Sequence, residues 1–166
     1  AIAPFQIVLF PVAAHVNENV MPAIKGLAES LRSSGYRVKL DDRDVRPGVK
    51  HYDWEIKGAP IRLELGPRDL ESGNCVLSLR TGGKEEVSIE GISETIRNRL
   101  DTISDELRRR SSVHIESLIR PFPGVVPTGD KWGLAGEIED GVIYEIAFDG
   151  NDSDAEVLEK LTGLAI

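Results

Sequence analysis

The first 40 residues change their apolar pattern twice, and this order restricts the fold more than any other feature. Residues 5–12 are almost continuously apolar, as in a buried strand that ends near a proline. Residues 20–31 then repeat apolar side chains at helical spacing, and residues 36–40 alternate with a period of two. A strand, a helix and a second strand in this order favour parallel pairing through a helical crossover. We therefore expect an α/β fold.

The elements expected after residue 40 extend this pattern. Their positions follow from apolar periodicity and from Gly and Pro at their ends. We expect a short helix at 52–57, strands at 61–65, 75–80 and 85–89, and a long amphipathic helix at 92–118. Thr81-Gly82-Gly83-Lys84 predicts a hairpin turn between the last two strands. The sequence thus predicts a mixed five-stranded sheet flanked by helices.

A Pro/Gly-rich stretch at residues 121–127 cannot continue a helix and predicts a linker. The chain carries 18 basic and 18 acidic side chains before residue 121, but 2 basic and 10 acidic ones after residue 120, so the second part holds the whole net charge of −8. We expect a first domain at 1–120 and a small α+β C-terminal domain at 121–166. The second should have one clear strand at 141–148 and a helix that opens at 152–156. We expect it to pack on something else, because its core is marginal.

The composition, with 40% apolar and 29% charged residues, is that of an ordinary globular protein. No run of 18 apolar residues is present, so we expect no membrane span. The first five residues lack the basic start of a secretory signal, and the absence of an initiator Met indicates processing or a longer parent chain. The single cysteine, Cys75, excludes an internal disulfide and a multi-cysteine zinc site and is expected in the core. A reducing cytoplasm fits this usage.

No complete catalytic constellation is present in the sequence. The turn at residues 81–84 lacks the glycine and hydroxyl spacing of a phosphate-binding loop, and His15, His51 and His114 are too scattered for a recognisable metal site. Asp41-Asp42-Arg43-Asp44 could in principle bind Mg²⁺. Because Arg43 and Arg46 would compete for these carboxylates, we favour a salt-bridged loop.

Residues 41–71 give the strongest indication of binding, with 6 basic and 8 acidic side chains among glycines and prolines. We expect the loop or element-end cations of this segment to lie near one edge of the sheet: Arg43, Arg46, Lys50, Lys57 and Arg68. An arginine matches guanine O6/N7 or a phosphate, and a carboxylate can accept from a guanine edge. Such a mixture reads single-stranded RNA, with His51 and Tyr52 available for stacking and Trp54 expected in the core. Neutralisation of the local acids alone stays open as an alternative.

Four strings within these residues closely resemble the anticodon-binding domain of prolyl-tRNA synthetases of the archaeal and eukaryotic-like type. The strings are Asp41–Asp44, Arg46–Lys50, Asp53–Pro60 and Glu64–Glu71, and the resemblance covers about residues 1–120. It implies the class II synthetase anticodon-binding fold and recognition of the two guanines of the proline anticodon. It also implies a cytoplasmic homodimeric enzyme that attaches proline to tRNA(Pro) through a prolyl-adenylate. ATP and Mg²⁺ would bind outside this segment.

Carried over by motif, the resemblance gives a set of expected anticodon contacts. The leading ones are Arg46, Lys50 and Arg68, followed by Asp42, Arg43 and Lys57. Class II catalytic motifs are missing from these residues, so the segment itself is expected to be non-catalytic. Residues 149–154 lack the cysteines that often bind zinc in the family, so we expect no zinc here. The alternative is a free-standing accessory module of the same fold that binds RNA or protein.

Overall fold

The computed structural model describes residues 3–147 and 150–165. These residues form two compact units, Ala1–Arg108 and Arg109–Ile166, and the boundary between the units lies within helix α4 (Ile92–Leu118). Each unit is described below by itself. No helix in the described ranges is both long enough and apolar enough to cross a membrane.

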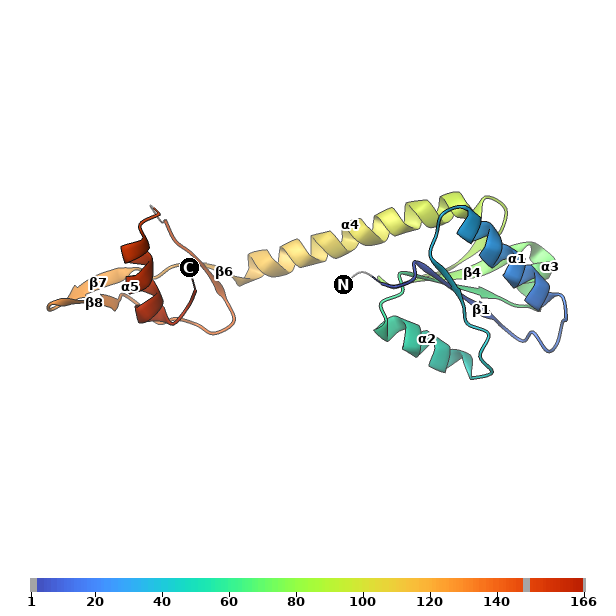
Figure 1. The fold of residues 1–166 in the computed structure, drawn as a ribbon, viewed down its shortest axis with the longest axis horizontal. Coiled ribbons are helices and arrows are strands. Elements are labelled where there is room, and N and C mark those ends of the chain that lie inside the picture. Colours follow the sequence, from blue (N-terminus) through green and yellow to red (C-terminus); the bar gives the residue numbers. More distant parts are fainter. Residues whose placement is uncertain (1–2, 148–149, 166) are drawn as a thin grey trace. The chain divides into compact units, whose positions relative to one another are not determined.

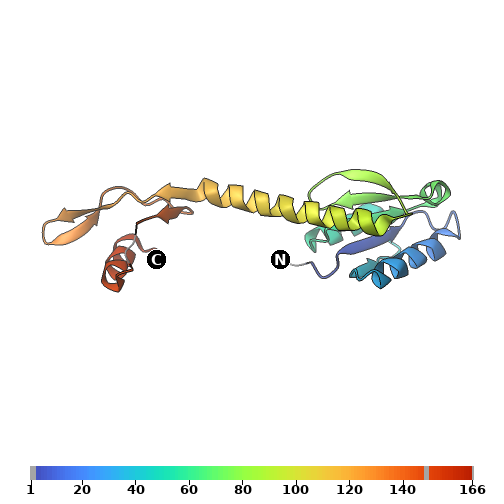
Figure 2. The same ribbon diagram turned by 90° about the horizontal axis from the view of Figure 1, so that it is seen from above.

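The first unit is built on one mixed five-stranded sheet, as predicted (Figure 1). The strands lie in the order β2 (Val38–Leu40), β1 (Ile7–Pro11), β3 (Ile61–Leu65), β4 (Asn74–Leu79) and β5 (Lys84–Ser88). β1 pairs in parallel with β2 and β3, whereas β4 pairs antiparallel with β3 and β5. Three helices connect the strands: α1 (Val20–Ser33), α2 (Pro47–Ile56) and α3 (Pro67–Ser72). The β4–β5 hairpin lies at the edge of the sheet away from α1 (Figure 2).

The two faces of this sheet are covered differently. Alternate strand residues such as Ile61, Leu63 and Leu77 point to one face, where they form the main core with α1, α4 and Leu70 of α3. On the other face only α2 packs, and its Trp54 contacts a small cluster with Val8, Phe10 and Ala59 at the β1 side. Figure 1 shows α2 on the side of the sheet opposite α1. The part of the second face formed by β3, β4 and β5 therefore lacks an apolar helical cover.

Helix α1 confirms the prediction from helical spacing in both its core face and its end. Its buried residues are the predicted ones: Val20, Ile24, Leu27, Ala28 and Leu31. Gly35 adopts a φ of +89° and donates to the Arg32 carbonyl, while Tyr36 donates to the Leu31 carbonyl. This pair of bonds is a Schellman C-terminus, and it needs the left-handed backbone that glycine adopts without strain.

Two helices depart from the prediction, and a proline explains each departure. α2 begins at Pro47 rather than at the predicted residue 52, and α3 was not predicted. Proline fits the first helical turn because its φ is preset and its missing N–H would be unpaired there anyway. In α3 the Gly66 N–H also donates to Asp69 Oδ2 at 2.8 Å, which closes the first turn. Both prolines are helix starts, whereas the sequence reading treated them as parts of a loop.

The second unit contains more strands than the sequence predicted. β6 (Ile119–Pro121) pairs in parallel with β9 (Ile143–Glu145), and β7 (Val125–Thr128) pairs antiparallel with β8 (Lys131–Leu134). The predicted linker at 121–127 was therefore partly wrong, because ladder pairing overrides its proline content. The clear strand predicted at 141–148 is shorter, and Phe148 lies outside the described residues.

The helix predicted to open at residues 152–156 is confirmed as α5 (Asp152–Thr162), which begins where Asn151 Oδ1 accepts from the Ser153 N–H. Within the described part of this unit, Leu158 is the one buried hydrophobic side chain. A core of this size is marginal. The expectation that this unit packs on something else stays a prediction.

Candidate nucleic-acid interface

The second sheet face beside α2 carries a group of charged side chains that we call the ionic face. It consists of His51 and Glu55 from α2, Arg62 and Glu64 from β3, and Lys84 from β5. Arg62 and Glu64 alternate with the core residues of β3, so they point away from the main core. Ser78 of β4 lies between Arg62 and Lys84 in the register of the sheet. Strand alternation thus places both signs of charge on one surface.

The contacts within the ionic face are long or poorly directed. Arg62 Nη1 donates to the His51 carbonyl at 3.3 Å and to Glu55 Oε2 at 3.4 Å, near the upper limit for a hydrogen bond. Glu64 Oε1 lies 3.1 Å from His51 Nε2 and 3.0 Å from Lys84 Nζ. The Lys84 contact is an ion pair, but neither contact has hydrogen-bond geometry, so Glu64 Oε1 is a buried acceptor without a hydrogen-bond donor. Arg62 Nε is likewise a buried donor without an acceptor.

Two buried polar atoms without hydrogen bonds so close along one strand are unusual, because such atoms nearly always have hydrogen-bond partners in folded proteins. Their ion-pair neighbours are exposed: the Lys84 side chain is 58% exposed and that of Glu55 is 68% exposed. Movement of these two side chains would uncover a donor and an acceptor together. The ionic face therefore offers paired hydrogen-bonding groups to a polar ligand.

Asp41, at the end of β2, organises the charged loop that we define as residues 41–46. Its carboxylate accepts from Arg43 Nε and Nη2 at 2.8 and 2.7 Å and from Trp54 Nε1 at 2.7 Å. Its carbonyl accepts from Lys50 Nζ at 3.1 Å. Hydrogen bonds from Arg43 hold the pKa of Asp41 well below its usual range, against the opposing effect of burial, and the Trp54 hydrogen bond adds to the lowering.

Arg43 also bonds Asp53 of α2, with Nη1 2.8 Å from Oδ2. Its pKa is raised by the Asp41 hydrogen bonds first and by Asp53 second. The salt-bridged loop favoured over a Mg²⁺ site is therefore what the structure shows. The prediction that Trp54 belongs to the core is confirmed as well, since this side chain is buried.

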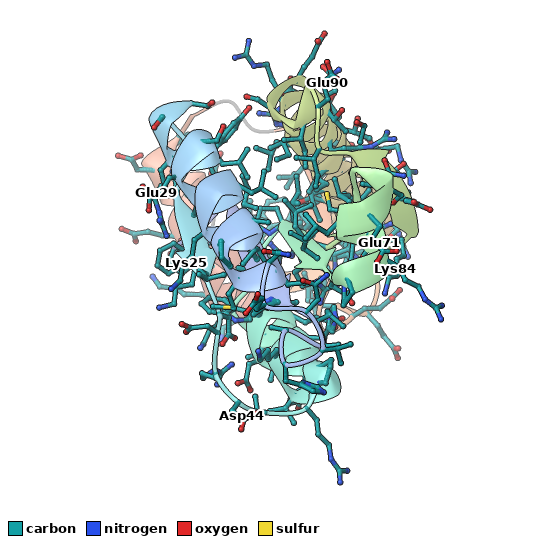
Figure 3. All side chains as sticks on the ribbon, turned by 90° about the vertical axis from the view of Figure 1, so that its right-hand side faces the viewer. Lys25, Glu29, Asp44, Glu71, Lys84 and Glu90 are labelled. Carbon is teal, nitrogen blue, oxygen red and sulfur yellow. The ribbon has the colours of Figure 1, made fainter. Side chains whose placement is uncertain are left out.

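The predicted contact residues occupy different positions. Arg46, Arg68 and Asp42 are exposed, and among the described residues none of the three makes a hydrogen bond or ion pair through its side chain. Arg46 precedes α2 and Arg68 begins α3, so both follow the carboxyl ends of parallel strands and lie at the same sheet edge. Figure 3 shows Asp44 in the same charged loop and Lys84 at the hairpin.

The expected positions of two of these residues need correction. Lys50 is not a free cation, because it is only 5% exposed and its Nζ bonds the Asp41 carbonyl. Lys57 does not lie at the edge shared by the other cations. It ends α2, just before the amino end of β3, and its Nζ lies 4.5 Å from the centre of the Trp54 ring in a cation–π contact. The sequence predicted a helix only at residues 52–57. Because α2 begins at Pro47, Lys50 lies within the helix and Lys57 at its far end.

A cleft of about 540 Å³ joins the charged loop to the ionic face. The loop contributes Arg43 and Arg46, while the ionic face contributes His51 and Glu64. Phe10, whose ring centre lies 5.0 Å from that of His51 in an edge-on contact, forms part of the wall. The cleft lies at the carboxyl ends of β1 and β3, and ligands of open α/β sheets commonly bind in such crevices.

The described residues show no basis for metal or thiol chemistry. No group of three or more His, Cys, Asp or Glu side chains within them could hold a metal ion. Asp149, in the segment where the resemblance would place zinc-binding cysteines, lies outside the described residues. Cys75 is fully buried in β4, as predicted, and burial raises the pKa of its thiol to about 12. It is a core residue rather than a nucleophile.

Sequence reasoning did not select Glu55, Arg62, Glu64 or Lys84 as site residues. The alternation Ile61-Arg62-Leu63-Glu64-Leu65 was read as a half-buried strand, which is confirmed. The polar residues of this strand could have indicated the ionic face, because an arginine and a glutamate two residues apart on a strand share one face. Lys84 could be added only once the hairpin register was known.

Comparison with known proteins gives a family match for most of the first unit. Residues 6–99 match the family described as "Anticodon binding domain", which is more than half of the chain. The chain belongs to this anticodon binding domain family. The matched region contains the whole charged loop and the whole ionic face.

The relatives of this anticodon binding domain include archaeal proteins named proline--tRNA ligase. The one from Methanothermobacter thermautotrophicus is 45% identical over 121 residues, which cover 72% of this chain and 25% of the relative. The one from Thermococcus kodakarensis is 44% identical with the same coverage. The one from Methanocorpusculum labreanum is 32% identical over 166 residues, or 99% of this chain and 33% of the relative. The resemblance to prolyl-tRNA synthetases is therefore confirmed, and the chain spans a quarter to a third of these relatives.

Proposed function

We propose that residues 1–120 recognise the anticodon of tRNA(Pro) as the anticodon-binding domain of a proline--tRNA ligase. One observation of the structure supports this proposal most directly. The ionic face holds a buried donor, Arg62 Nε, and a buried acceptor, Glu64 Oε1, and neither atom has a hydrogen-bond partner among the described residues. A ligand with adjacent donors and acceptors would complete both.

The two guanines of a proline anticodon have the required chemistry. A guanine offers O6 and N7 as acceptors to an arginine or lysine, and N1–H and N2–H as donors to a carboxylate. Arg62 and Lys84 would supply the donors, and Glu64 or Glu55 would supply the carboxylate. The bases of a single-stranded loop are free to enter such a face, unlike those of a helix.

The charged loop has a second role in this proposal. Asp42 and Arg46 of this loop, together with Arg68 of α3, are free to contact the RNA at the carboxyl ends of the strands. Arg43 and Lys50 hold the loop in place through Asp41, so they support RNA binding by positioning the loop. Lys57 would act through its stacking on Trp54.

We further propose that the full-length protein attaches proline to tRNA(Pro) through a prolyl-adenylate, as a cytoplasmic homodimer. ATP, Mg²⁺ and proline would bind a catalytic domain outside these 166 residues. Residues 121–166 would form a separate C-terminal domain without zinc. The relatives' names and the family match support this assignment.

The decisive experiment measures binding of the chain to a tRNA(Pro) transcript and to transcripts in which one anticodon guanine is replaced by adenosine. Each replacement should weaken binding by about 1–3 kcal/mol, by analogy with a bidentate base contact in DNA. Replacing Arg62 with Gln should reduce this discrimination. Arg32→Gln is the matched control, because Arg32 is an exposed arginine of α1 that pairs with Glu29. Equal affinity for all transcripts would refute the proposal.

A free-standing accessory module that binds RNA or protein is the second candidate. It would bind its partner without discriminating the proline anticodon from other anticodons. A reading frame that encodes class II catalytic motifs next to this segment would support the synthetase and exclude the accessory module.

A further inference from the structure

A second pocket in the first unit lies at the opposite edge of the sheet from the charged loop. Its volume is about 480 Å³, and it is lined by Arg37 after α1, Arg80 after β4, and Arg97 and Asp101 of α4. Pro60, just before the amino end of β3, forms part of the same wall. Three arginines and one carboxylate give this pocket, which we call the arginine pocket, an excess of two positive charges.

Two of the three arginines are available to a ligand. Arg37 is fixed in place, because Nε donates to the Pro4 carbonyl at 3.1 Å and Nη2 to the Ala3 carbonyl at 3.3 Å. Arg80 and Arg97 are exposed, and within the described residues neither side chain makes a hydrogen bond or ion pair. Clusters of unneutralised arginines repel one another, so an anion would stabilise this arrangement.

The guanidinium of Arg80 lies against the backbone of Gly58. A Cβ atom added at this glycine would be 3.3 Å from Arg80 Nη1, and the φ of +72° there also favours glycine. A larger residue at position 58 would push the guanidinium out of its place. The absence of a side chain at Gly58 therefore leaves room for the Arg80 guanidinium beside the pocket.

Pro60 and Arg80 of the arginine pocket lie close to the position of Arg62 in the sheet. The Arg80 N–H donates to the Pro60 carbonyl at 2.9 Å, and Arg62 lies two residues further along β3. An RNA strand whose bases contact Arg62 and Glu64 would extend toward Arg80 on the same side of β3 and β4. Its nearest phosphate is the anion most readily delivered to this pocket.

We propose that the arginine pocket binds a backbone phosphodiester of the same RNA, with Arg80 and Arg97 as the phosphate contacts and Arg37 as a positioning residue. This inference rests on the proposed function, because it takes its RNA from the ionic face. Arginine suits the site, since its planar fork donates two parallel bonds to phosphate oxygens. Such contacts carry no base information and add affinity for any sequence.

The test uses the chain and its variants Arg80→Gln, Arg97→Gln and the double variant. Binding is measured by fluorescence anisotropy over a range of salt concentrations. The ligands are the tRNA(Pro) transcript and the transcript in which one anticodon guanine is replaced by adenosine. Each substitution should weaken both transcripts by the same factor, leaving base discrimination unchanged. The slope of log affinity against log salt should fall by about 0.7–0.9 for each arginine, as expected for one lost phosphate contact.

Arg32→Gln again serves as the matched control, and Arg80→Lys should restore part of the salt slope, because lysine keeps the charge without the fork. Unchanged affinity and slope in the double variant would overturn the proposal and would assign the pocket to another anion, such as an acidic protein surface. A loss confined to one transcript would also overturn it, because it would mark a base contact.

Failure of the proposed function gives a different result. If the chain binds RNA without discriminating the anticodon guanines, the proposed function is wrong. The phosphate site still stands in that case, provided that the arginine variants lower the affinity and the salt slope.

Discussion

The two faces of the five-stranded sheet differ although the same strands form both. In β4, Leu77 is fully buried in the main core, while its neighbour Val76 is half-buried beside the ionic face. In β3, Leu63 and Glu64 show the same contrast. One face stabilises the fold through apolar burial, whereas the other keeps polar atoms whose hydrogen bonds are incomplete. The difference teaches that stability and recognition are separated by strand alternation rather than by distance along the chain.

Leu77→Ala should cause the largest loss of stability of the substitutions considered. A small loss would contradict the difference between the two faces. The substitution leaves a cavity in the main core, so the free energy of unfolding should fall by about 2–5 kcal/mol. Val76→Thr is the matched control on the other face and should stay below about 1 kcal/mol, because the site is half-buried and its neighbours are polar. Urea denaturation of both variants measures the difference. Equal losses would mean that the second face is as tightly packed as the first.

Asp41→Asn should give an intermediate effect on stability that depends on pH. Loss of the charged partner of Arg43 should lower the free energy of unfolding by about 1–3 kcal/mol at neutral pH. Because the pKa of Asp41 is lowered in the folded chain, its contribution is fully present above about pH 4 and is lost as the pH falls through the lowered value.

The difference in stability between the wild-type chain and Asp41→Asn should therefore shrink in strong acid. Denaturant titrations at pH 7 and at successively lower pH values provide the measurement. Asp42→Asn is the control, since Asp42 is an exposed neighbour. A difference that stays constant with pH would contradict the assigned role of Asp41.

Lys84→Gln should give the smallest change in stability. It tests whether a residue of the ionic face contributes to RNA binding without contributing to the fold. Its side chain is 58% exposed, so the free energy of unfolding should change by less than about 0.5 kcal/mol. The affinity for the tRNA(Pro) transcript should nevertheless fall, because Lys84 lies over Glu64 on the ionic face. Lys25→Gln, an exposed lysine of α1 (Figure 3), should leave both quantities unchanged. An RNA affinity unaffected by Lys84→Gln would remove this residue from the interface.

The sequence predicted the sheet and the core of the first unit because both depend on short-range periodicity. Residues 20–31 repeat their apolar side chains every three or four positions, and the same residues are buried in α1. The starts of α2 and α3 were missed, because a proline after Arg46 or Gly66 is typical of loops as well as of first helical turns. In the second unit β6 and β7 were missed for a related reason, since each contains a proline.

The candidate site was predictable only in part. Arg43 and its acidic neighbours were recognised as a salt-bridged loop, but the sequence cannot show that Lys50 is buried beneath it. The ionic face joins residues from α2, β3 and β5, which are up to 33 positions apart, so its composition depends on the register of the hairpin. The sequence placed Lys57 at the same end of the sheet as the other cations. Its actual position depends on the length of α2, which separates it from them.

The hydrogen bonds around Asp41 have a consequence for the kinetics of RNA binding. Arg43, Lys50 and Trp54 all bond this one residue, so the backbone of the charged loop is held before any ligand arrives. Binding then loses little conformational entropy in ordering the loop, and association need not wait for a rearrangement there. Differences between correct and incorrect anticodons should therefore appear in how long the RNA stays bound rather than in how fast it binds.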